Sequence, residues 1–240
     1  MYGPSDREPL VSVYIPTYNR AGLLLERAVP SVLSQTYRNL ELIVVGDHCT
    51  DDTAERLTAV TDRRLRFVNL PARRRRYPDD VEIHWLAGPV VAANKGLDLV
   101  TGRWIARIDD DDMWTPHHIE TLLTFALSGR YEFVSACYAT ERHGQPVVVD
   151  VRDERPRIGG TQTWLYRSYL RFFRYNIHCW RKSWNRVNDT DLQDRMHTAG
   201  VRMGFLEEVV AYVFPRPGET TVGLEAYHLT ASAKAEHFRF

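Results

Sequence analysis

The stretch WIARIDDDDMWTPHHIE, residues 104–120, sets five residues typical of a buried strand directly before four consecutive aspartates, Asp109 to Asp112. Adjacent carboxylates repel one another unless a cation or hydrogen-bond donors compensate their charge. A charge run usually forms a solvated turn, but a run that follows a buried strand lies at the carboxyl edge of a sheet. The next residues have a helical pattern, and we expect a helix to start near Thr115.

The first 140 residues alternate strand-like and helix-like segments, which is typical of βαβ units on a mostly parallel sheet. The expected strands are 11–15, 41–45, 64–70, 104–108 and 132–138, and the expected helices are 21–35, 51–61 and 91–100. Pro30 lacks a backbone N–H and should kink or restart the first helix. The sequence therefore predicts an α/β fold with ligands at the carboxyl ends of the strands.

Two later regions extend this organisation. Residues 71–89 are too many for an ordinary connection and are rich in Arg, Pro and aromatic residues, so we expect a functional loop or an inserted hairpin. Beyond residue 140 the alternation stops, with a helix expected over 188–200 and a strand over 208–214. The second half is expected to form a further layer of the same domain.

Composition excludes several classes of protein. The 31 basic and 31 acidic residues balance, so no net field draws the chain to nucleic acid or an anionic membrane. Cys49, Cys137 and Cys179 form no CxxC pair, which argues against a zinc site or a disulfide framework. No stretch approaches the roughly 18–20 apolar residues of a membrane span. We expect a soluble, cytoplasmic protein with no nucleic-acid partner, and the oligomeric state stays open.

The aspartate run has the chemistry of a cation site. Oxygen ligands without paired Cys or His suit Mg²⁺ or Mn²⁺, ions that commonly bind one or two carboxylates together with substrate phosphates. The sequence therefore predicts a site for a divalent metal and a diphosphate at Asp109 to Asp112.

Four motifs, in this order and spacing, resemble the inverting family 2 glycosyltransferases of the GT-A fold. They are VSVYIPTYNR (11–20), SVLSQTYRNLELIVVGDHCTDDT (31–53), AANKGLDLVTGRWIARIDDDDMW (92–114) and NDTDL (188–192). The resemblance covers about residues 10–215. It implies a Rossmann-like three-layer sandwich forming a single domain over 1–240, with a nucleotide-sugar half at about 10–115, an acceptor half at about 116–215 and a C-terminal tail at 216–240.

The resemblance also implies the donor site. Its nucleotide-binding residues would be Pro16, Thr17, Tyr18, Asn19, Asp47, Asn94, Lys95, Asp109 and Asp110, with Asp111 on the metal. Asp109 would face the ribose, and one of Asp110 and Asp112 would point to solvent or cap the next helix. Asn19 is also a candidate helix N-cap, as is Asp51.

The chain departs from the family pattern at several donor positions. Gly46 replaces an acid and His48-Cys49 replaces Gly-Ser, which leaves the base open, although uracil is common in the family. Ala93 stands where the family has arginine, and Lys95 or an arginine of 73–76 is the candidate substitute near the phosphates.

In the family, the general base lies in a Glu-Asp motif that opens a helix. Asp189 matches the aspartate, and Asn188 replaces the glutamate. A first-turn acid interacting with the helix dipole is the other interpretation of Asp189. Asp191 and His178 are the alternative bases. His228 is a candidate third metal ligand or a structural histidine.

The segment 161–184 is dense in aromatic residues and arginines. It could form an acceptor platform, because aromatic faces pack on sugar rings and arginine binds phosphates, or a core helix with a basic solvent face. Trp164, His178 and Asp191 are the acceptor-binding candidates.

The predicted function is metal-dependent, inverting transfer of one sugar from a nucleotide-diphosphate sugar, expected to be UDP-linked, to an acceptor hydroxyl. Processive synthases of the family carry membrane helices and a Gln-x-x-Arg-Trp motif, and the sequence shows neither. The alternatives are a sugar nucleotidyltransferase and a non-catalytic nucleotide-sugar-binding module.

Overall fold

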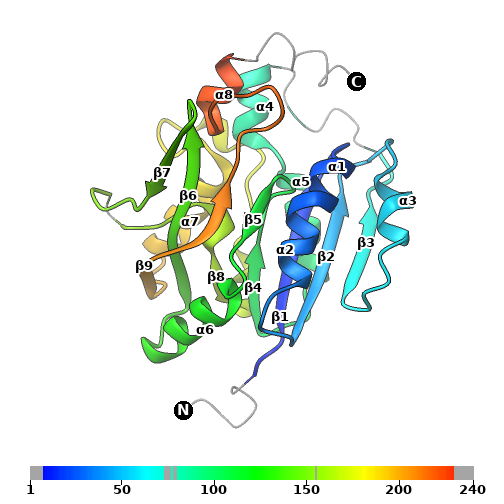
Figure 1. The fold of residues 1–240 in the computed structure, drawn as a ribbon. Coiled ribbons are helices and arrows are strands. Elements are labelled where there is room, and N and C mark those ends of the chain that lie inside the picture. The colour runs from blue at the N-terminus through cyan, green and yellow to red at the C-terminus, as the bar shows by residue number, and fades with distance from the viewer. Residues whose placement is uncertain (1–7, 73–76, 78–79, 155, 230–240) are drawn as a thin grey trace.

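The computed structural model describes residues 8–72, 77, 80–154 and 156–229. Strands of this described part join in one mixed sheet of order β3-β2-β1-β4-β8-β6-β9-β5, with β7 beside β6 (Figure 1). The strands are β1 (Val11–Thr17), β2 (Leu40–Gly46), β3 (Leu65–Asn69), β4 (Trp104–Arg107), β5 (Asp112–Trp114), β6 (Phe133–Arg142), β7 (Gln145–Val149), β8 (Leu165–Arg167) and β9 (Met203–Val213). Strands β3, β2, β1 and β4 pair in parallel, and β8 adds the first antiparallel partner.

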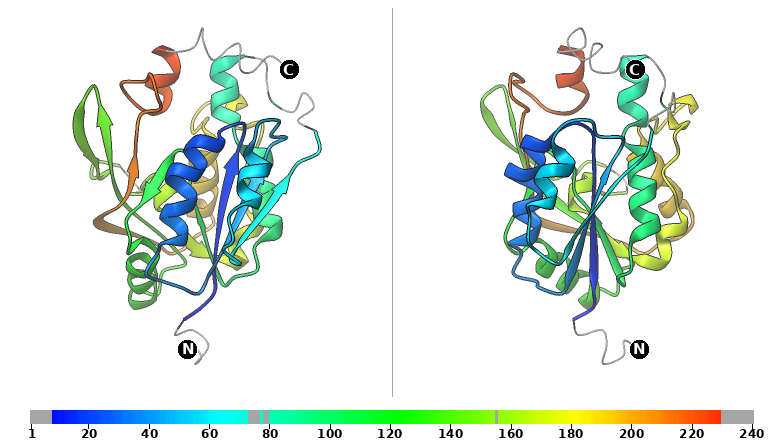
Figure 2. Two further views of the ribbon diagram at one scale, coloured as in Figure 1. Left: turned by 45° about the vertical axis from the view of Figure 1, so that its right-hand side comes forward. Right: turned by 90° about the vertical axis from the view of Figure 1, so that its right-hand side faces the viewer.

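Helices cover both faces of the sheet (Figure 2). They are α1 (Ala21–Leu23), α2 (Val29–Leu33), α3 (Thr53–Thr58), α4 (Val81–Ala87), α5 (Val90–Leu99), α6 (His118–Ser128), α7 (Asn188–Thr198) and α8 (Gly223–Leu229). None of these helices in the described part of the chain combines the length and apolar character that crossing a bilayer requires.

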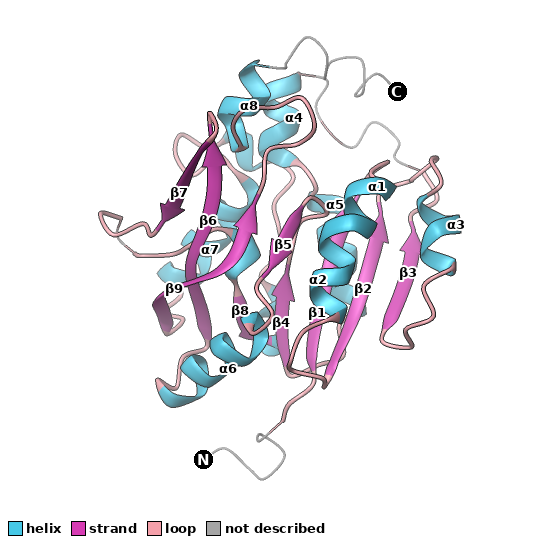
Figure 3. Ribbon diagram, viewed as in Figure 1, coloured by secondary structure: helices cyan, strands magenta, loops and turns pink. Residues whose placement is uncertain are grey.

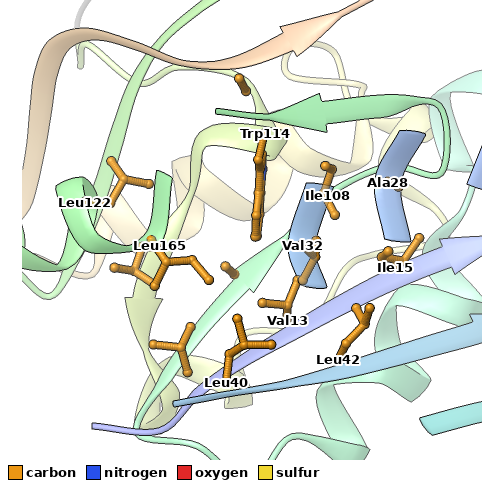
Figure 4. Packing of buried hydrophobic residues seen from close by; sticks show 14 of the residues in the cluster. Val13, Ile15, Ala28, Val32, Leu40, Leu42, Ile108, Trp114, Leu122 and Leu165 are labelled. Carbon is orange, nitrogen blue, oxygen red and sulfur yellow. The ribbon is translucent and has the colours of Figure 1, made fainter. Parts of the chain in front are cut away.

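The central strands are buried on both faces, as expected of parallel strands between helical layers. Successive side chains of β1 point to opposite faces, so Val13 and Ile15 enter the cluster under α2 and α6, whereas Tyr14 enters the cluster under α5 and α7. Figure 4 shows Val13 and Ile15 packed beside Val32 and Ala28. These two clusters confirm the expected three-layer α/β sandwich.

The expected first helix is present, but its irregularity precedes Pro30. Residues Leu24–Ala28 form a π-turn, in which the amide of Val29 bonds to the carbonyl of Leu24. Pro30 then occupies the first turn of α2, where a missing N–H costs little. The helix is therefore interrupted by a wider turn and restarts as α2 beside Pro30, which agrees with the expected restart.

Several expectations for the connections are wrong. Residues 80–87 form α4 with its Asp80 cap, not a hairpin, and the arginines 73–76 lie outside the described residues. The segment 161–184 contains short 3-10 turns and β8 rather than one core helix. Helix α6 begins at His118, not near Thr115.

The carboxyl ends of β1, β2 and β4 meet at one edge of the sheet, because the three strands run in parallel. Helices α4 and α8 lie side by side above this edge (Figures 1 and 3), and Trp85 of α4 lies 6.2 Å from Tyr227 of α8 between ring centroids. Residues 216–229 are therefore folded over the sheet edge and do not form a free tail.

Candidate active site

A cleft with two lobes opens at this edge. The first lobe has a volume of about 200 Å³ and the second of about 490 Å³. The residues that line both lobes are Trp85, Asp109, Asp111, Thr161, Asp189 and Arg216. The aspartate run and the predicted base therefore lie where the two lobes join.

The four aspartates take different partners. Asp109 accepts from the Arg107 guanidinium at 2.8 Å and is 37% exposed at its side chain. Asp110 is buried and accepts from Thr17 Oγ1 at 2.7 Å and Arg20 Nη1 at 3.0 Å.

Asp111 lies between two guanidiniums. Its Oδ2 accepts from Arg216 Nε at 2.5 Å and lies 3.5 Å from Arg20 Nη1, and its backbone carbonyl accepts from Arg27. Burial raises the pKa of Asp111, but the attraction of Arg216 and Arg20 outweighs burial and lowers that pKa to about 2. Asp111 is therefore ionised across the neutral range.

Asp112 is less compensated, because the charge of Arg216 opposes burial only in part. It is buried at the start of β5, and burial, aided by repulsion from Asp111, raises its pKa well above the ordinary value. Because Asp110 and Asp112 are both buried, the expectation that one of them points to solvent or caps a helix is wrong. The charge run is tolerated in part because Arg107, Arg20 and Arg216 neutralise Asp109, Asp110 and Asp111.

The donor atoms present fit a divalent ion that is completed by a substrate. Asp109 and Asp111 place carboxylates on both lobes. The described part of the chain holds no group of three or more His, Cys, Asp or Glu arranged for a metal ion. Such a sparse oxygen set suits Mg²⁺ or Mn²⁺ bound through one or two carboxylates and substrate phosphates, not a preformed protein cage.

The first lobe is bordered by Pro16 at the end of β1 and by the loops after β1 and β2, which contribute Tyr18 and Asp47. The loop after β2 is held by Asn69, whose Oδ1 accepts from Cys49 N at 2.8 Å and whose Nδ2 donates to Cys49 O at 2.9 Å. A Cβ on Gly46 would approach Asn69 Oδ1 to 2.6 Å. Gly46 thus leaves room for the amide that shapes the Asp47 turn, which explains this departure from the family pattern.

Thr17, Asn19 and Asp51 support these loops and do not line the cleft. Thr17 is buried and donates to Asp110, and exposed Asn19 accepts from Thr50 N at 2.8 Å, which ties the two loops together. Asn19 is not an N-cap of α1, because Asp51 Oδ2 accepts from Ala21 N instead. Asp51 Oδ1 also accepts from Thr53 N, the first residue of α3, although Asp52 occupies the N-cap position of that helix.

Asn94 and Lys95 do not line the first lobe. Both line a separate hollow beside Leu70 and Ile177. The Asn94 amide bonds to the backbone of Tyr175 through Nδ2 at 2.9 Å and Oδ1 at 3.0 Å. Helix α5 thus turns these side chains toward residues 175–177 and away from the first lobe.

Asp189 lies in the first turn of α7 and lines both lobes. Its Oδ1 accepts from Thr190 N at 2.8 Å. Burial raises the pKa of Asp189, and the charge of Arg107 opposes this effect. Neighbouring Asn188 donates to the carbonyls of Leu86 and Gly88 at 3.1 and 2.7 Å, and so fixes α7 to the end of α4.

The other candidates from the second half have structural positions. Asp191 is 1% exposed and pairs with Lys182 at 2.8 Å and Arg195 at 2.9 Å, so it is not placed to act as a base or contact an acceptor. Trp164 is 1% exposed, with Nε1 donating to Gly159 O, and cannot present a face to a sugar. Exposed His178 lies outside both lobes.

His228 is also not placed to bind a metal at the aspartates, because its Nε2 lies 3.5 Å from Glu82 on the outer side of α4 and α8 and it lines neither lobe. Sequence reasoning missed Arg20 and Arg216, which directly contact the aspartates. Arg20 ends the motif VSVYIPTYNR and had a sequence signal. Arg216 had no sequence signal, because it is far from Asp111 in the chain and contacts it only in the folded structure.

The second lobe adds aromatic and charged residues that no motif marked. They are Tyr138, Arg142, Phe214, Glu219, Leu224 and Glu225. Together with Trp85 they offer flat apolar faces and hydrogen-bonding groups, which suits a polar ring compound.

Comparison with known sequences places this cleft in context. Residues 12–188 match the profile described as glycosyl transferase family 2. A putative colanic acid biosynthesis glycosyl transferase WcaA of Escherichia coli K12 is 35% identical over 117 residues, or 48% of this chain and 37% of that protein. The UDP-Glc:alpha-D-GlcNAc-diphosphoundecaprenol beta-1,3-glucosyltransferase WfgD of Escherichia coli is 30% identical over 129 residues, which are 54% of this chain and 46% of that protein. The aligned part is less than half of either relative.

Solved structures share the fold. The crystal structure of Staphylococcus aureus TarS 1-349 with UDP-GlcNAc has a TM-score of 0.69 and 18% identity, covering 95% of this chain and 70% of that one. The mannosyltransferase PcManGT of Pyrobaculum calidifontis with GDP-Man and Mn²⁺ has a TM-score of 0.65 and 21% identity, and the match covers 90% of this chain and 60% of that one. These likenesses confirm the expected GT-A type fold.

Proposed function

This chain belongs to glycosyl transferase family 2, and we propose that it transfers one sugar from a UDP-linked donor to an acceptor hydroxyl with inversion at the anomeric carbon. The observation that carries the proposal is the position of Asp189, which lines both lobes together with Asp109 and Asp111. A base at the junction of a donor lobe and an acceptor lobe is what a single displacement requires.

The first lobe is the proposed donor site. Pro16, Tyr18 and Asp47 would border the nucleoside, with Asp47 accepting from the base and Asp109 from the ribose. The relative WfgD is named for a UDP-Glc donor and TarS was solved with UDP-GlcNAc, which supports a uridine nucleotide, although PcManGT was solved with GDP-Man. Arg20 and Arg216 would meet the diphosphate, because guanidinium groups bind phosphate oxygens in pairs.

A divalent cation held by Asp111, with Asp109 beside it, would supply positive charge to the departing diphosphate. The protein prepares that position by keeping Asp111 ionised, since its two arginine partners lower its pKa. The PcManGT complex contains Mn²⁺, which supports the use of a divalent ion by this fold.

Asp189 is the proposed general base. It would take the proton of the acceptor hydroxyl as that oxygen attacks the anomeric carbon and the bond to the diphosphate breaks. The raised pKa of the Asp189 carboxyl strengthens it as a base, and the charge of Arg107 keeps the carboxyl from being protonated too readily. The aromatic faces of Tyr138, Phe214 and Trp85 would position the acceptor in the second lobe.

The donor part of the proposal is tested by calorimetry of UDP and GDP with Mn²⁺ and with EDTA. We expect UDP to bind more tightly than GDP and to require the metal. Asp47→Ala should weaken UDP binding about 10- to 100-fold, because a lost hydrogen bond to a buried base costs about 1–3 kcal/mol. Asp52→Asn, an exposed carboxylate of the same loop, is the matched control. Unchanged preference for UDP in Asp47→Ala would contradict the assignment of the base contact.

A further inference from the structure

Arg216 lies on a segment that only the tertiary structure brings to the cleft. Residues 214–222, called the strap below, join β9 to α8 and pass beside α4 (Figure 1). The far end of the strap is held by α8, where Thr221 Oγ1 donates to Glu225 and Tyr227 meets Trp85. The Arg216 side chain is 27% exposed and lines both lobes.

The ion pair of Arg216 with Asp111 conflicts with the proposed use of Asp111. Arg216 Nε lies 2.5 Å from Asp111 Oδ2, the same oxygen that Arg20 approaches at 3.5 Å. A divalent cation binds this carboxylate less tightly while a guanidinium donates to Oδ2, because the two cations repel each other and share the same negative charge. Arg216 and the metal therefore compete for Asp111.

Of the two arginines, Arg216 can dissociate from Asp111 more easily than Arg20. Arg20 also donates to Asp110 at 3.0 Å, and Asp110 is fixed from behind by Thr17, so Arg20 keeps a carboxylate partner if it loses Asp111. Among the residues that the structure describes, the further carboxylate near Arg216 is that of Glu219, at the longer distance of 4.0 Å. After release from Asp111, the guanidinium of Arg216 would remain at the junction of the two lobes, where a diphosphate would enter.

Resting on the proposed function, we infer that Arg216 exchanges partners during donor binding. In the ligand-free protein it neutralises Asp111. When a nucleoside diphosphate enters, Arg216 transfers to the phosphate oxygens and frees Asp111 for the cation. Arg216 is thus a positioning residue that competes with the metal alone and cooperates with the metal when the nucleotide is present. The exchange also couples the strap, which borders the second lobe, to occupation of the first lobe.

This exchange predicts effects of opposite sign on two ligands. In Arg216→Gln, Asp111 loses its competing cation, so Mn²⁺ alone should bind about two- to tenfold more tightly, as expected for removing one partly exposed ion pair. The same variant loses a charged donor to phosphate, so UDP with Mn²⁺ should bind about 10- to 100-fold more weakly. A purely structural role for Arg216 cannot raise one affinity while lowering the other.

The test follows free Mn²⁺ by electron paramagnetic resonance and UDP binding by calorimetry, with melting temperature as the measure of folding. Arg142→Gln is the matched control, because Arg142 lines the second lobe without an ion pair to Asp111 among the described residues. Arg142→Gln should leave Mn²⁺ binding unchanged. If Arg216→Gln folds poorly, Arg216→Lys replaces it, because lysine keeps the positive charge but lacks the planar guanidinium. In Arg216→Lys, UDP binding should weaken while Mn²⁺ binding stays near the wild-type value.

The outcomes separate this inference from the proposed function. In Arg216→Gln, tighter binding of Mn²⁺ alone, together with weaker binding of UDP in the presence of Mn²⁺, supports the exchange. The exchange would be refuted if Arg216→Gln weakened both affinities, strengthened both or changed neither. The proposed function would survive any of these results, provided that the wild-type protein binds UDP. A wild-type protein that binds no nucleoside diphosphate would refute the proposed function, and the exchange with it.

Discussion

Replacing Asp189 by asparagine separates the two roles that this carboxylate could have. The Oδ1 of asparagine can still accept from Thr190 N, so the local structure of α7 should be kept. The amide cannot take a proton from the acceptor, so turnover should fall by about 10²–10⁴-fold, the usual contribution of a general base. Affinity for the donor should change little, because Asp189 acts on the acceptor hydroxyl.

The stability of the same variant has a predicted sign. Burial raises the pKa of Asp189 in the folded protein, so the ionised carboxylate destabilises the fold at pH values above that pKa. Asparagine removes this penalty at neutral pH, and the gain should fade as the pH falls toward the unfolded value of about 3.9. The melting temperature of Asp189→Asn at pH 7 should therefore be equal to or above that of the wild type.

Asp191→Asn is the matched control, since it alters a carboxylate two residues away on the same helix. Asp191 is buried between Lys182 and Arg195, and loss of a buried charge from such a network costs about 3 kcal/mol. A domain of this size then melts roughly 6–12 °C lower. The turnover of the folded fraction should remain near the wild-type value.

The assay measures release of UDP from UDP-sugars in the presence of an acceptor panel, with thermal melting in parallel. In the wild type, turnover should rise with pH through a pKa above the ordinary aspartate value, as Asp189 loses its proton. The reasoning is refuted if Asp189→Asn keeps near-normal turnover, or if its turnover falls only in proportion to a lower melting temperature.

Three further results are expected. Asp111→Asn should make UDP binding equal in Mn²⁺ and EDTA by calorimetry, and a remaining metal effect would place the ion elsewhere. Gly46→Ala should destabilise the protein by about 1–3 kcal/mol in urea unfolding and weaken UDP binding, because the new Cβ would overlap Asn69 Oδ1 at 2.6 Å. Burial lowers the pKa of His118 to about 3, so the folded state does not take up the proton that the unfolded state binds below about 6.5. Stability should fall by about 2 kcal/mol between pH 7 and pH 5, and His118→Asn should flatten that slope.

The sequence alone located the edge of the sheet where the proposed donor site lies. The runs VSVYI, ELIVV and WIARI are short and rich in β-branched and other apolar residues, which predicts buried parallel strands, and the structure has strands at all three. Parallel strands end at one edge, so Pro16, Asp47 and the aspartate run had to lie together there. Asp189 reached the same cleft as the family pattern implied, although its chemical role stays a proposal.

Other assignments failed because a motif does not determine which way a side chain points. Asn94 and Trp164 stand in segments correctly placed near the site, but their polar groups bond to the backbone of Tyr175 and Gly159. Asp191 is two residues from Asp189, yet it turns inward to a lysine and an arginine. In each case burial selected the partner that leaves the fewest polar groups unsatisfied.

What the sequence by itself determined was therefore the set of elements and the edge where polar loops gather, because strand burial and turn chemistry are properties of short segments. What only the tertiary structure decided was the pairing of charges across the cleft. Asp111 and Arg216 are 105 positions apart, and nothing in either neighbourhood signals the other. Their contact depends on how β9, the strap and α8 fold back over the sheet, and the energy of an ion pair depends on the separation and burial of its two charges in space.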